Sequence, residues 1–467
     1  MTSNSFKKNL FWLGVQRELL SILGSLPLAI TLFLVIALCS TVGTVLPQQE
    51  GPQYYQQNYP DQGKVLFGFL TWKVILALGL NDVYRAWWFL ALLILFGTSL
   101  ATCSFLRQIP MLKSARKWRF YDNPKRLKKF ALFTEVPATL EQLIQEFQQK
   151  GFQIHTEGQK IYGHKGLLGR VGPIIVHVSI ILILLGGMLG ALTGFKTQSM
   201  TPDGEQFDFH QLTSPGPWTV APKWQVKVNR FWIDYRPDGS IKQFYSDLSI
   251  IDTDGKEKAR KTISVNDPMN YDGVSLYQAS WGVDSILFRV NDTPWVKIPM
   301  RPLEQVINGK ETWGAIIPLD NNDQAKMVLA TNGLQGTVQA ILFGAEQPIP
   351  ISLKPGVPAE LTPSLRLEVK GVTGATGIQS KKDPGTVLVY TGFGLLMIGV
   401  MMSYLSHSQV WGFAKDGVVY FAGRTNRAQI TFEREFMSVA SNLQNRQSGP
   451  SDVIRAEPST LSKEPRR

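Results

Sequence analysis

Four long apolar segments constrain this chain more than any other feature of its sequence. Each runs for about 20 residues or more without Lys, Arg, Asp or Glu, and they span residues 26–46, 86–106, 171–195 and 386–405. An apolar helix of about 20 residues is long enough to cross the hydrocarbon core of a bilayer. The sequence therefore predicts a membrane protein with four transmembrane α-helices. The first segment is too long, and lacks a clear cleavage site, for a signal peptide.

The distribution of charge predicts how these helices are oriented. Segments 1–25, 107–170 and 406–467 together carry a net charge of +13, whereas segments 47–85 and 196–385 together carry −1. Lys and Arg accumulate on the cytoplasmic side of a membrane. We therefore expect both termini and residues 107–170 to be cytoplasmic, and the other two segments to be lumenal. Because topology accounts for the basic charge, it gives no support to a nucleic-acid ligand.

The largest segment between the helices, residues 196–385, has the pattern of an antiparallel β domain. Apolar and polar residues alternate along it, and Pro-Asp-Gly and Thr-Asp-Gly turns separate the first strands. It has no long helical pattern. It also lacks the zinc-protease, nucleophile-elbow and phosphate-loop motifs. We therefore expect a large extracytoplasmic surface for binding rather than for catalysis.

The remaining segments are smaller. Residues 107–170 predict an α+β unit. Its helix is capped by Thr139 and Gln142 and ends at Gly151, and a hairpin follows. The tail 406–447 predicts two strands around a Lys-Asp-Gly turn and then a helix, and residues 448–467 are expected to be disordered. In the loop 47–85, residues 65–80 predict an interfacial helix.

One imidazole, that of His177, lies within the third apolar segment. Ionisable groups inside a membrane span are costly and usually mark function or a buried polar partner. Gly186, Gly190 and Gly194 follow at intervals of four, which lets another helix approach closely, and Gly186 lies about 180° around the helix from His177. Two interpretations stay open: a hydrogen bond to a neighbouring helix, or a functional role of the ring, which burial keeps neutral.

The two cysteines, Cys39 and Cys103, do not form a C-x-x-C motif. They lie toward opposite ends of antiparallel helices, so we expect them not to meet. This pattern argues against a thiol–disulfide oxidoreductase.

Five stretches, in this order, resemble the ResB/CcsB family of system II cytochrome c maturation. They are STVGTVLPQ after the first span, DVYRAWWFLALLILFGTSLATCSFLR around the second, VGPIIVHVSI in the third, NDPMNYDGVSLYQASWG in the β domain and HSQVWGFAKDGVVYFAGRTNRA after the fourth. The match covers nearly the whole chain. The four-span form is most similar to cyanobacterial and plastid members, which implies the thylakoid membrane and delivery of haem b to apocytochromes c, namely cytochromes f and c6.

The resemblance also implies a partner, a CcsA-type membrane protein. The tryptophan-rich haem-presenting segment of this family belongs to that partner and is absent here, because Trp87 and Trp88 are followed by Phe89 and Leu90 within a span. This chain is then at most a non-catalytic subunit of a holocytochrome c synthase complex, and the second ligand of a haem at His177 comes from the partner.

Further candidate residues are weaker. His164 and His407 flank membrane spans on the cytoplasmic side, where they are expected to be interface residues or to help admit haem. His210 of the β domain is a further candidate haem contact. The aromatic residues Tyr271, Tyr277 and Trp281 are candidate contacts for the partner or the apocytochrome, although residues of these types also form β-domain cores.

Two rival functions come from other classes of protein. A transporter subunit is disfavoured because there are only four spans, no inverted repeat and no charged residue within a span. A membrane anchor for an extracytoplasmic sensor domain leaves His177 unexplained.

Overall fold

The computed structural model describes residues 3–61, 70–213, 215–307, 310–318, 326–335, 337–343, 349–362 and 365–446. These residues form two compact units. The first unit comprises Met1–Val42, Trp87–Leu185 and Val387–Arg467, and the second comprises Gly43–Ala86 and Gly186–Thr386. The expected disorder over 448–467 lies outside the described residues.

Four helices in the described part of the chain are long and apolar enough to cross a membrane, which confirms the prediction. They are α2 (Leu26–Val45), α5 (Trp87–Cys103) with its continuation to Ala115, α9 (Leu168–Thr193) and α10 (Thr386–Ser403). A further helix, α1 (Ser3–Leu23), precedes them. The sequence pattern did not predict α1.

The continuation of α5 contains a change of helix type. A π-helical turn (η2, Ser104–Gln108) joins α5 to α6 (Ile109–Ala115), and the amide of Ile109 donates to the carbonyl of Ser104. Pro110 follows at once; it has no amide hydrogen, and its ring would clash with the carbonyl four residues earlier in a regular α-helix. The wider turn accommodates this residue.

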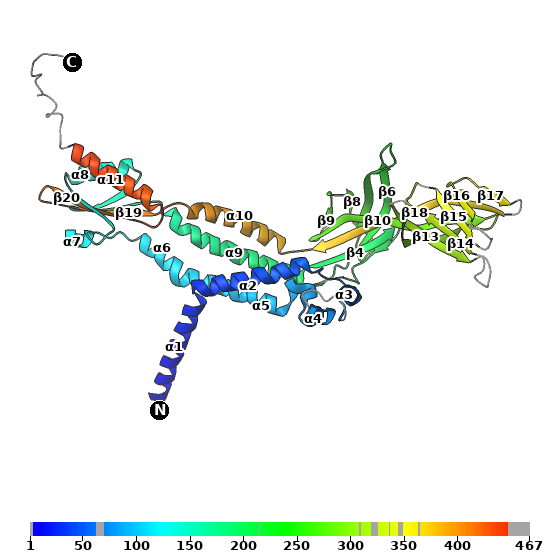
Figure 1. The fold of residues 1–467 in the computed structure, drawn as a ribbon, viewed down its shortest axis with the longest axis horizontal. Coiled ribbons are helices and arrows are strands. Elements are labelled where there is room, and N and C mark those ends of the chain that lie inside the picture. The colour runs from blue at the N-terminus through cyan, green and yellow to red at the C-terminus, as the bar shows by residue number, and fades with distance from the viewer. Residues whose placement is uncertain are drawn as a thin grey trace, which may run out of the picture. The chain divides into compact units, whose positions relative to one another are not determined.

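Helices α9 and α10 pack against each other as antiparallel neighbours (Figure 1). The contact depends on glycine. A Cβ atom at Gly399 would lie 2.9 Å from the amide nitrogen of Val176, and one at Gly392 would lie 2.6 Å from Cγ1 of Ile183. Larger side chains at these two positions would push the helices apart.

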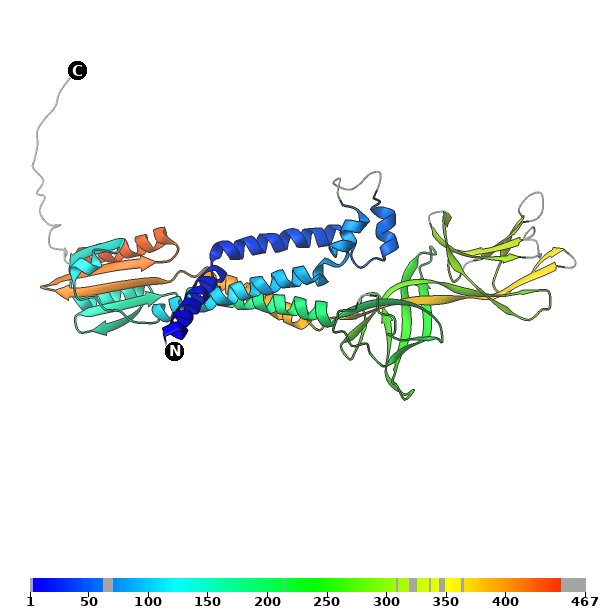
Figure 2. The same cartoon turned by 90° about the horizontal axis from the view of Figure 1, so that it is seen from below.

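Helix α9 also lies beside α2 and α5 (Figure 2). Leu32 of α2 and Phe96 and Leu100 of α5 form a buried apolar cluster, against which Ile180 and Leu184 of α9 pack. The three helices therefore form a bundle in which one face of α9 is turned toward α5.

The glycine stripe of α9 is occupied by the chain's own backbone. A Cβ atom at Gly190 would lie 2.6 Å from Oδ1 of Asp383, and one at Gly194 would lie 2.8 Å from the carbonyl oxygen of Lys382. The stripe therefore packs against the segment that leads into α10.

The α+β part of the first unit combines segments that precede α9 with segments that follow α10 (Figure 1). Its antiparallel sheet has the order β1-β20-β19-β3-β2. The strands are β1 (Leu132–Pro137), β2 (Gln153–Glu157), β3 (Lys160–Lys165), β19 (Ser408–Lys415) and β20 (Val418–Thr425). The predicted hairpins are thus confirmed, and they share one sheet.

Two helices cover one face of this sheet, namely α8 (Leu140–Gln149) and α11 (Gln429–Asn445), over a core of 15 buried residues. The capping box of Thr139 and Gln142 is present, as expected. The other face carries a second, aromatic cluster around Tyr162 and Trp411, beside the short helix α7 (Pro124–Leu127).

The loop of the second unit contains three short helices in its described residues: α3 (Pro52–Asn58), α4 (Trp72–Ala77) and η1 (Leu80–Arg85). The interfacial helix expected over 65–80 falls partly outside the described residues. In the described part, Gly79 has a φ of 66°, and this left-handed residue separates α4 from η1.

The β region consists of antiparallel sheets and, in its described residues, contains no helix, as expected. The first sheet comprises β5 (Gln206–Phe207), β6 (Gln225–Tyr235), β7 (Ile241–Ile251) and β8 (Glu257–Ser264). The Pro-Asp-Gly and Thr-Asp-Gly segments form the turns between its last three strands.

A second sheet is built on two long strands, β10 (Val274–Val290) and β18 (Leu365–Lys382), which pair along most of their length. It adds β4 (Phe195–Pro202), β9 (Met269–Tyr271), β11 (Val296–Pro299) and β17 (Ala359–Thr362). Because the long strands pass two separate apolar cores, the region is bipartite rather than built on one core.

The third sheet comprises β12 (Arg301–Ile307), β13 (Lys310–Pro318), β14 (Lys326–Thr331), β15 (Val338–Phe343) and β16 (Ile349–Leu353). Its buried residues belong to the second of the two cores. In this core they pack with Val283, Ile286 and Phe288 of β10 and with Leu367 and Val369 of β18.

Candidate functional site

His177 lies in the third turn of α9, and its ring faces the π-helical turn of the neighbouring helix. Its Nδ1 lies 3.3 Å from the carbonyl oxygen of Leu100 and 3.1 Å from Oγ of Ser104. Its Nε2 lies 3.1 Å from Nε2 of Gln108. Both ring nitrogens therefore have hydrogen-bond partners within the chain.

The π-helical turn explains why two polar side chains meet the imidazole. Ser104 is the first residue of this turn and Gln108 is the last, and Oγ of Ser104 also donates to the carbonyl of Leu100 at 2.9 Å. π-Helical turns occur frequently at functional sites. Sequence reasoning missed Ser104 and Gln108; the available signal was Pro110, two positions after the polar pair Arg107 and Gln108 at the end of an apolar run.

One neutral tautomer satisfies all three contacts of His177. The Nδ1–H donates toward Leu100 and Ser104, and the lone pair of Nε2 accepts from the side-chain amide of Gln108. A histidine that donates from Nδ1 to a backbone carbonyl has its Nε2 oriented as a metal ligand. Iron could bind at Nε2 only if the amide of Gln108 moved away.

The glycines and the histidine occupy different faces of α9, as their spacing predicts. Gly190 and Gly194 meet the segment before α10, whereas His177 meets α5 and η2. Val178, the next residue, is exposed. His177 itself is half-buried, so its ring lies at the edge of the contact with α5.

The other two candidate histidines of the first unit lie close together at the end of the membrane helices. His407 is buried, and neither ring nitrogen has a hydrogen-bond partner among the described residues. Burial lowers the pKa of His407 to about 4, with smaller effects from the charges of Arg170 and His164. Burial also lowers the pKa of His164. Both imidazoles are thus held neutral at pH 7.

His164 also belongs to a row of stacked rings on one face of the sheet. His164 stacks on His155 with ring centroids 5.6 Å apart and on Tyr162 at 5.8 Å, and His155 stacks on Trp118 at 3.8 Å. Within the described residues, no group of three or more His, Cys, Asp or Glu residues could hold a metal ion.

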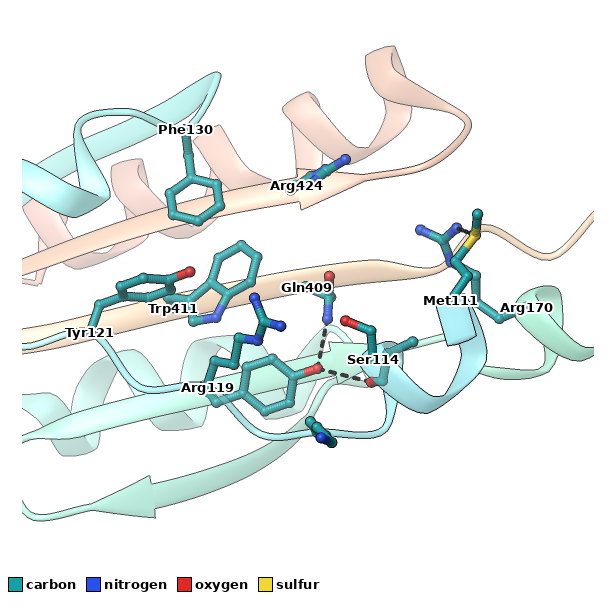
Figure 3. A pocket seen from close by; sticks show the side chains of 12 residues that line it. Met111, Ser114, Arg119, Tyr121, Phe130, Arg170, Gln409, Trp411 and Arg424 are labelled. Carbon is teal, nitrogen blue, oxygen red and sulfur yellow. Dashed lines mark hydrogen bonds between the residues drawn. The ribbon is translucent and has the colours of Figure 1, made fainter. Parts of the chain in front are cut away.

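A pocket of about 270 Å³ opens on the same face of the sheet (Figure 3). Its lining combines aromatic and basic residues: Met111, Ser114, Ala115, Lys117, Arg119, Tyr121, Phe130, Tyr162, Arg170, Gln409, Trp411 and Arg424. Sequence reasoning assigned the basic residues to membrane topology alone, and it missed the pocket because the lining comes from four separate segments.

The candidate residues of the β region have different surroundings. Tyr271 packs edge-on against Trp224, with ring centroids 5.3 Å apart, and Trp281 packs against Trp313 at 5.1 Å. Tyr277 is exposed. His210 is also exposed, and its Nδ1 lies 2.8 Å from Oδ2 of Asp208. Contact with the partner or the apocytochrome stays a prediction for the three aromatic residues, and contact with haem stays a prediction for His210.

Cys39 and Cys103 are free thiols in the structure, as expected. They are only partly buried and form no disulfide.

The chain is similar to known proteins along nearly its whole length. The ResB-like family matches residues 26–310 and 320–437. The chain is 48% identical over 452 residues to the cytochrome c biogenesis protein CcsB of Gloeobacter violaceus, covering 95% of each chain. It is also 48% identical over 431 residues to CcsB of Thermosynechococcus vestitus, covering 92% of this chain and 96% of that one.

A third relative, CcsB of Crocosphaera subtropica, is 46% identical over 432 residues, covering 92% of this chain and 95% of the relative. These similarities extend through both units and all four long apolar helices.

Proposed function

The chain belongs to the ResB-like family of cytochrome c biogenesis proteins, and on this basis we propose that it holds haem b within the membrane for delivery to apocytochromes c. The multi-pass membrane part and the family match support the general role. The observation that carries the specific proposal is the oriented imidazole of His177, whose Nδ1 donates to a backbone carbonyl. In this role haem is the cargo of the chain and not its resident cofactor.

We propose that His177 supplies one axial ligand and that a histidine of a CcsA-type partner supplies the other. Neutral imidazole is an ordinary axial ligand for haem iron. For iron to bind, the amide of Gln108 leaves Nε2 while Ser104 and Leu100 keep the ring in place. The chain is then a non-catalytic subunit of a holocytochrome c synthase, with cytochromes f and c6 as the products.

We place both termini and the α+β part in the cytoplasm and the β region in the thylakoid lumen. The support is the charge partition of +13 against −1. Alkaline-phosphatase fusions at Gln243 and Ser448 test this orientation. Activity only at Gln243 is expected, whereas activity only at Ser448 would reverse the assignment.

We propose that the exposed Tyr277 contacts the partner or the apocytochrome, with Tyr271 and Trp281 shaping the same block from 266 to 282. Tyr277→Ala is expected to lower holocytochrome formation at unchanged protein abundance. Trp281→Ala is the comparison, because its contact with Trp313 predicts a loss of folded protein. If Tyr277→Ala, like Trp281→Ala, lost activity only in proportion to its loss of folded protein, the contact proposal would be wrong.

The function is tested by holocytochrome formation in cells that express the chain with its partner. His177→Ala is expected to abolish covalent haem attachment, and added imidazole is expected to restore part of it by filling the vacant position. The matched control is His210→Ala, which removes an exposed imidazole from the β region. Normal holocytochrome levels with His177→Ala would refute the proposal.

A further inference from the structure

The pocket at the end of the membrane helices has the features of an anion site. Ser114 and Met111 come from α6, which continues an apolar helix, and Arg170 comes from the first turn of α9 (Figure 3). Gln409 and Trp411 of β19 form its floor. The pocket therefore lies where two membrane helices meet the folded α+β part, within one compact unit.

The charges that line this pocket are all of one sign. Lys117, Arg119, Arg170 and Arg424 contribute four cations, and no Asp or Glu is among the lining residues. None of the four forms an ion pair with a carboxylate of the described residues. Four like charges around one cavity repel one another unless an anion is bound.

The pocket also contains buried donors that lack acceptors. Trp411 is 5% exposed, and its indole Nε1–H has no hydrogen-bond partner among the described residues. The same holds for Nε of Arg170, whose Nη1 donates to the weak acceptor Sδ of Met111, at 2.9 Å. Buried donors are normally paired, so these two groups indicate that an acceptor belongs in the pocket.

The walls of the pocket are rigid. The rings of Phe130 and Trp411 stack with centroids 4.4 Å apart, and Tyr121 packs edge-on against Trp411. The hydroxyl of Tyr162 accepts from Nε2 of Gln409 at 2.8 Å. These contacts hold the indole nitrogen in place before any ligand arrives, which lowers the entropic cost of binding.

We propose that this pocket binds the carboxylate or phosphate group of an amphipathic anion whose apolar body extends toward the membrane helices. Arginine guanidinium groups match both kinds of group with paired hydrogen bonds. Basic pockets at the ends of membrane helices suit anionic lipid headgroups, and the propionates of haem offer the same chemistry. The site is independent of haem ligation by His177.

The test uses the purified full chain carrying His177→Ala, so that haem bound at the membrane histidine does not contribute. The pocket variants are Arg119→Gln with Arg424→Gln, which change two exposed side chains, and Trp411→Phe, which removes the indole donor and keeps an aromatic ring. The matched control is Lys415→Gln with Arg434→Gln, two exposed cations outside the pocket.

Two probes distinguish the sources of the anion. The first is haem, compared with haem dimethyl ester, titrated by absorbance into phosphatidylcholine nanodiscs that hold the chain. The second is phosphatidylglycerol, measured by mass spectrometry as the lipid retained from mixed nanodiscs. We expect each pocket variant to bind its probe about tenfold more weakly than the control variant does, since each loses a charge-assisted or buried hydrogen bond.

A loss confined to haem, with the dimethyl ester unaffected, supports propionates as the ligand. A loss confined to phosphatidylglycerol supports a lipid headgroup. If the pocket variants match the control variant with both probes, the proposal is overturned. None of these outcomes depends on whether His177 ligates haem, because His177 is absent throughout.

Discussion

The two polar sites of the first unit differ in how their buried nitrogens are satisfied. His177 has a partner for each ring nitrogen, all from its own chain. In the pocket beside β19, by contrast, Nε1 of Trp411 and Nε of Arg170 have no partner among the described residues. His177 already has its hydrogen bonds, and under the proposed ligation Gln108 has to leave Nε2 before iron can bind. The pocket donors gain a partner only when an acceptor enters.

This contrast determines how each site should respond to mutation. Removing the side-chain amide of Gln108 frees the lone pair of Nε2 and, under the proposed ligation, favours a ligand that competes for it. Removing a donor from the pocket takes away a group that has no partner, so ligand binding is expected to suffer more than folding.

The packing of α10 against α9 holds His177 in register with the π-helical turn. Gly399→Val is expected to push α9 away near Val176 and to destabilise the unit by about 1–3 kcal/mol through overpacking. Thermal unfolding of the chain in nanodiscs measures the loss. Gly394→Val is the control, because a Cβ atom there meets nothing within 4 Å. Equal stability of the two variants would mean that the close contact is not required.

If His177 ligates haem iron as proposed, the amide of Gln108 competes with iron for Nε2. Gln108→Leu removes one neutral hydrogen bond of about 1 kcal/mol, so the haem affinity of the complex is expected to rise about fivefold. A haem titration followed at the Soret band measures this. Gln148→Leu changes an exposed glutamine of α8 and serves as the control. An unchanged haem affinity in Gln108→Leu would show that the amide does not compete for Nε2 of His177.

His407, which is not among the residues that line the pocket, makes the first unit sensitive to acid. Its pKa is lowered to about 4 in the folded chain, so the unfolded chain binds a proton first as the pH falls below about 6.5. The stability that the neutral imidazole contributes is therefore complete above about pH 6.5 and is lost as the pH falls toward 4. His407→Leu is expected to flatten the melting temperature over this range, whereas His210→Leu is not. If the melting temperature of His407→Leu varied with pH as that of the wild type does, His407 would not be the cause of the acid sensitivity.

Under the proposed ligation at Nε2, Ser104 orients the imidazole from its Nδ1 side. Ser104→Ala leaves the donation from Nδ1 to Leu100 in place, so haem affinity is expected to fall only about two- to threefold. A hydrogen bond from Nδ1 to Oγ of Ser104 also raises the basicity of the imidazole at Nε2. The reduction potential of bound haem should therefore shift toward a more positive value. A potential identical to that of the wild type would remove this role.

The membrane helices could be predicted from the sequence more fully than the site could. Apolar runs report membrane spans directly. The glycine stripe of α9 was expected to receive another helix, and it instead meets the segment before α10, at Gly190 through Oδ1 of Asp383 and at Gly194 through the carbonyl oxygen of Lys382. The partners of His177 were not predicted, because the π-helical turn shifts which residues of α5 face α9. That shift follows from Pro110, whose effect on the helix is local and carries no periodic signal.

The pocket shows a second limit of sequence reasoning. Arg119, Arg170 and Trp411 are far apart in the chain. Trp411 comes close to Tyr162 and the other lining residues because β19 pairs with β3. The strands themselves were predicted from turns and alternation. Their pairing depends on tertiary contacts between segments that precede and follow the β region in the chain, which a local pattern does not encode.

Haem ligation by His177 is tested most directly by the Soret absorbance of the chain co-purified with its partner, for wild type and His177→Ala at matched protein concentration. Ligation predicts a Soret band in the wild type and its loss in His177→Ala, with the two proteins still assembled and part of the band restored by imidazole. His210→Ala should retain the full band. Unchanged haem content and an unchanged spectrum in His177→Ala would contradict ligation and leave His177 as a hydrogen-bonding residue between α9 and α5.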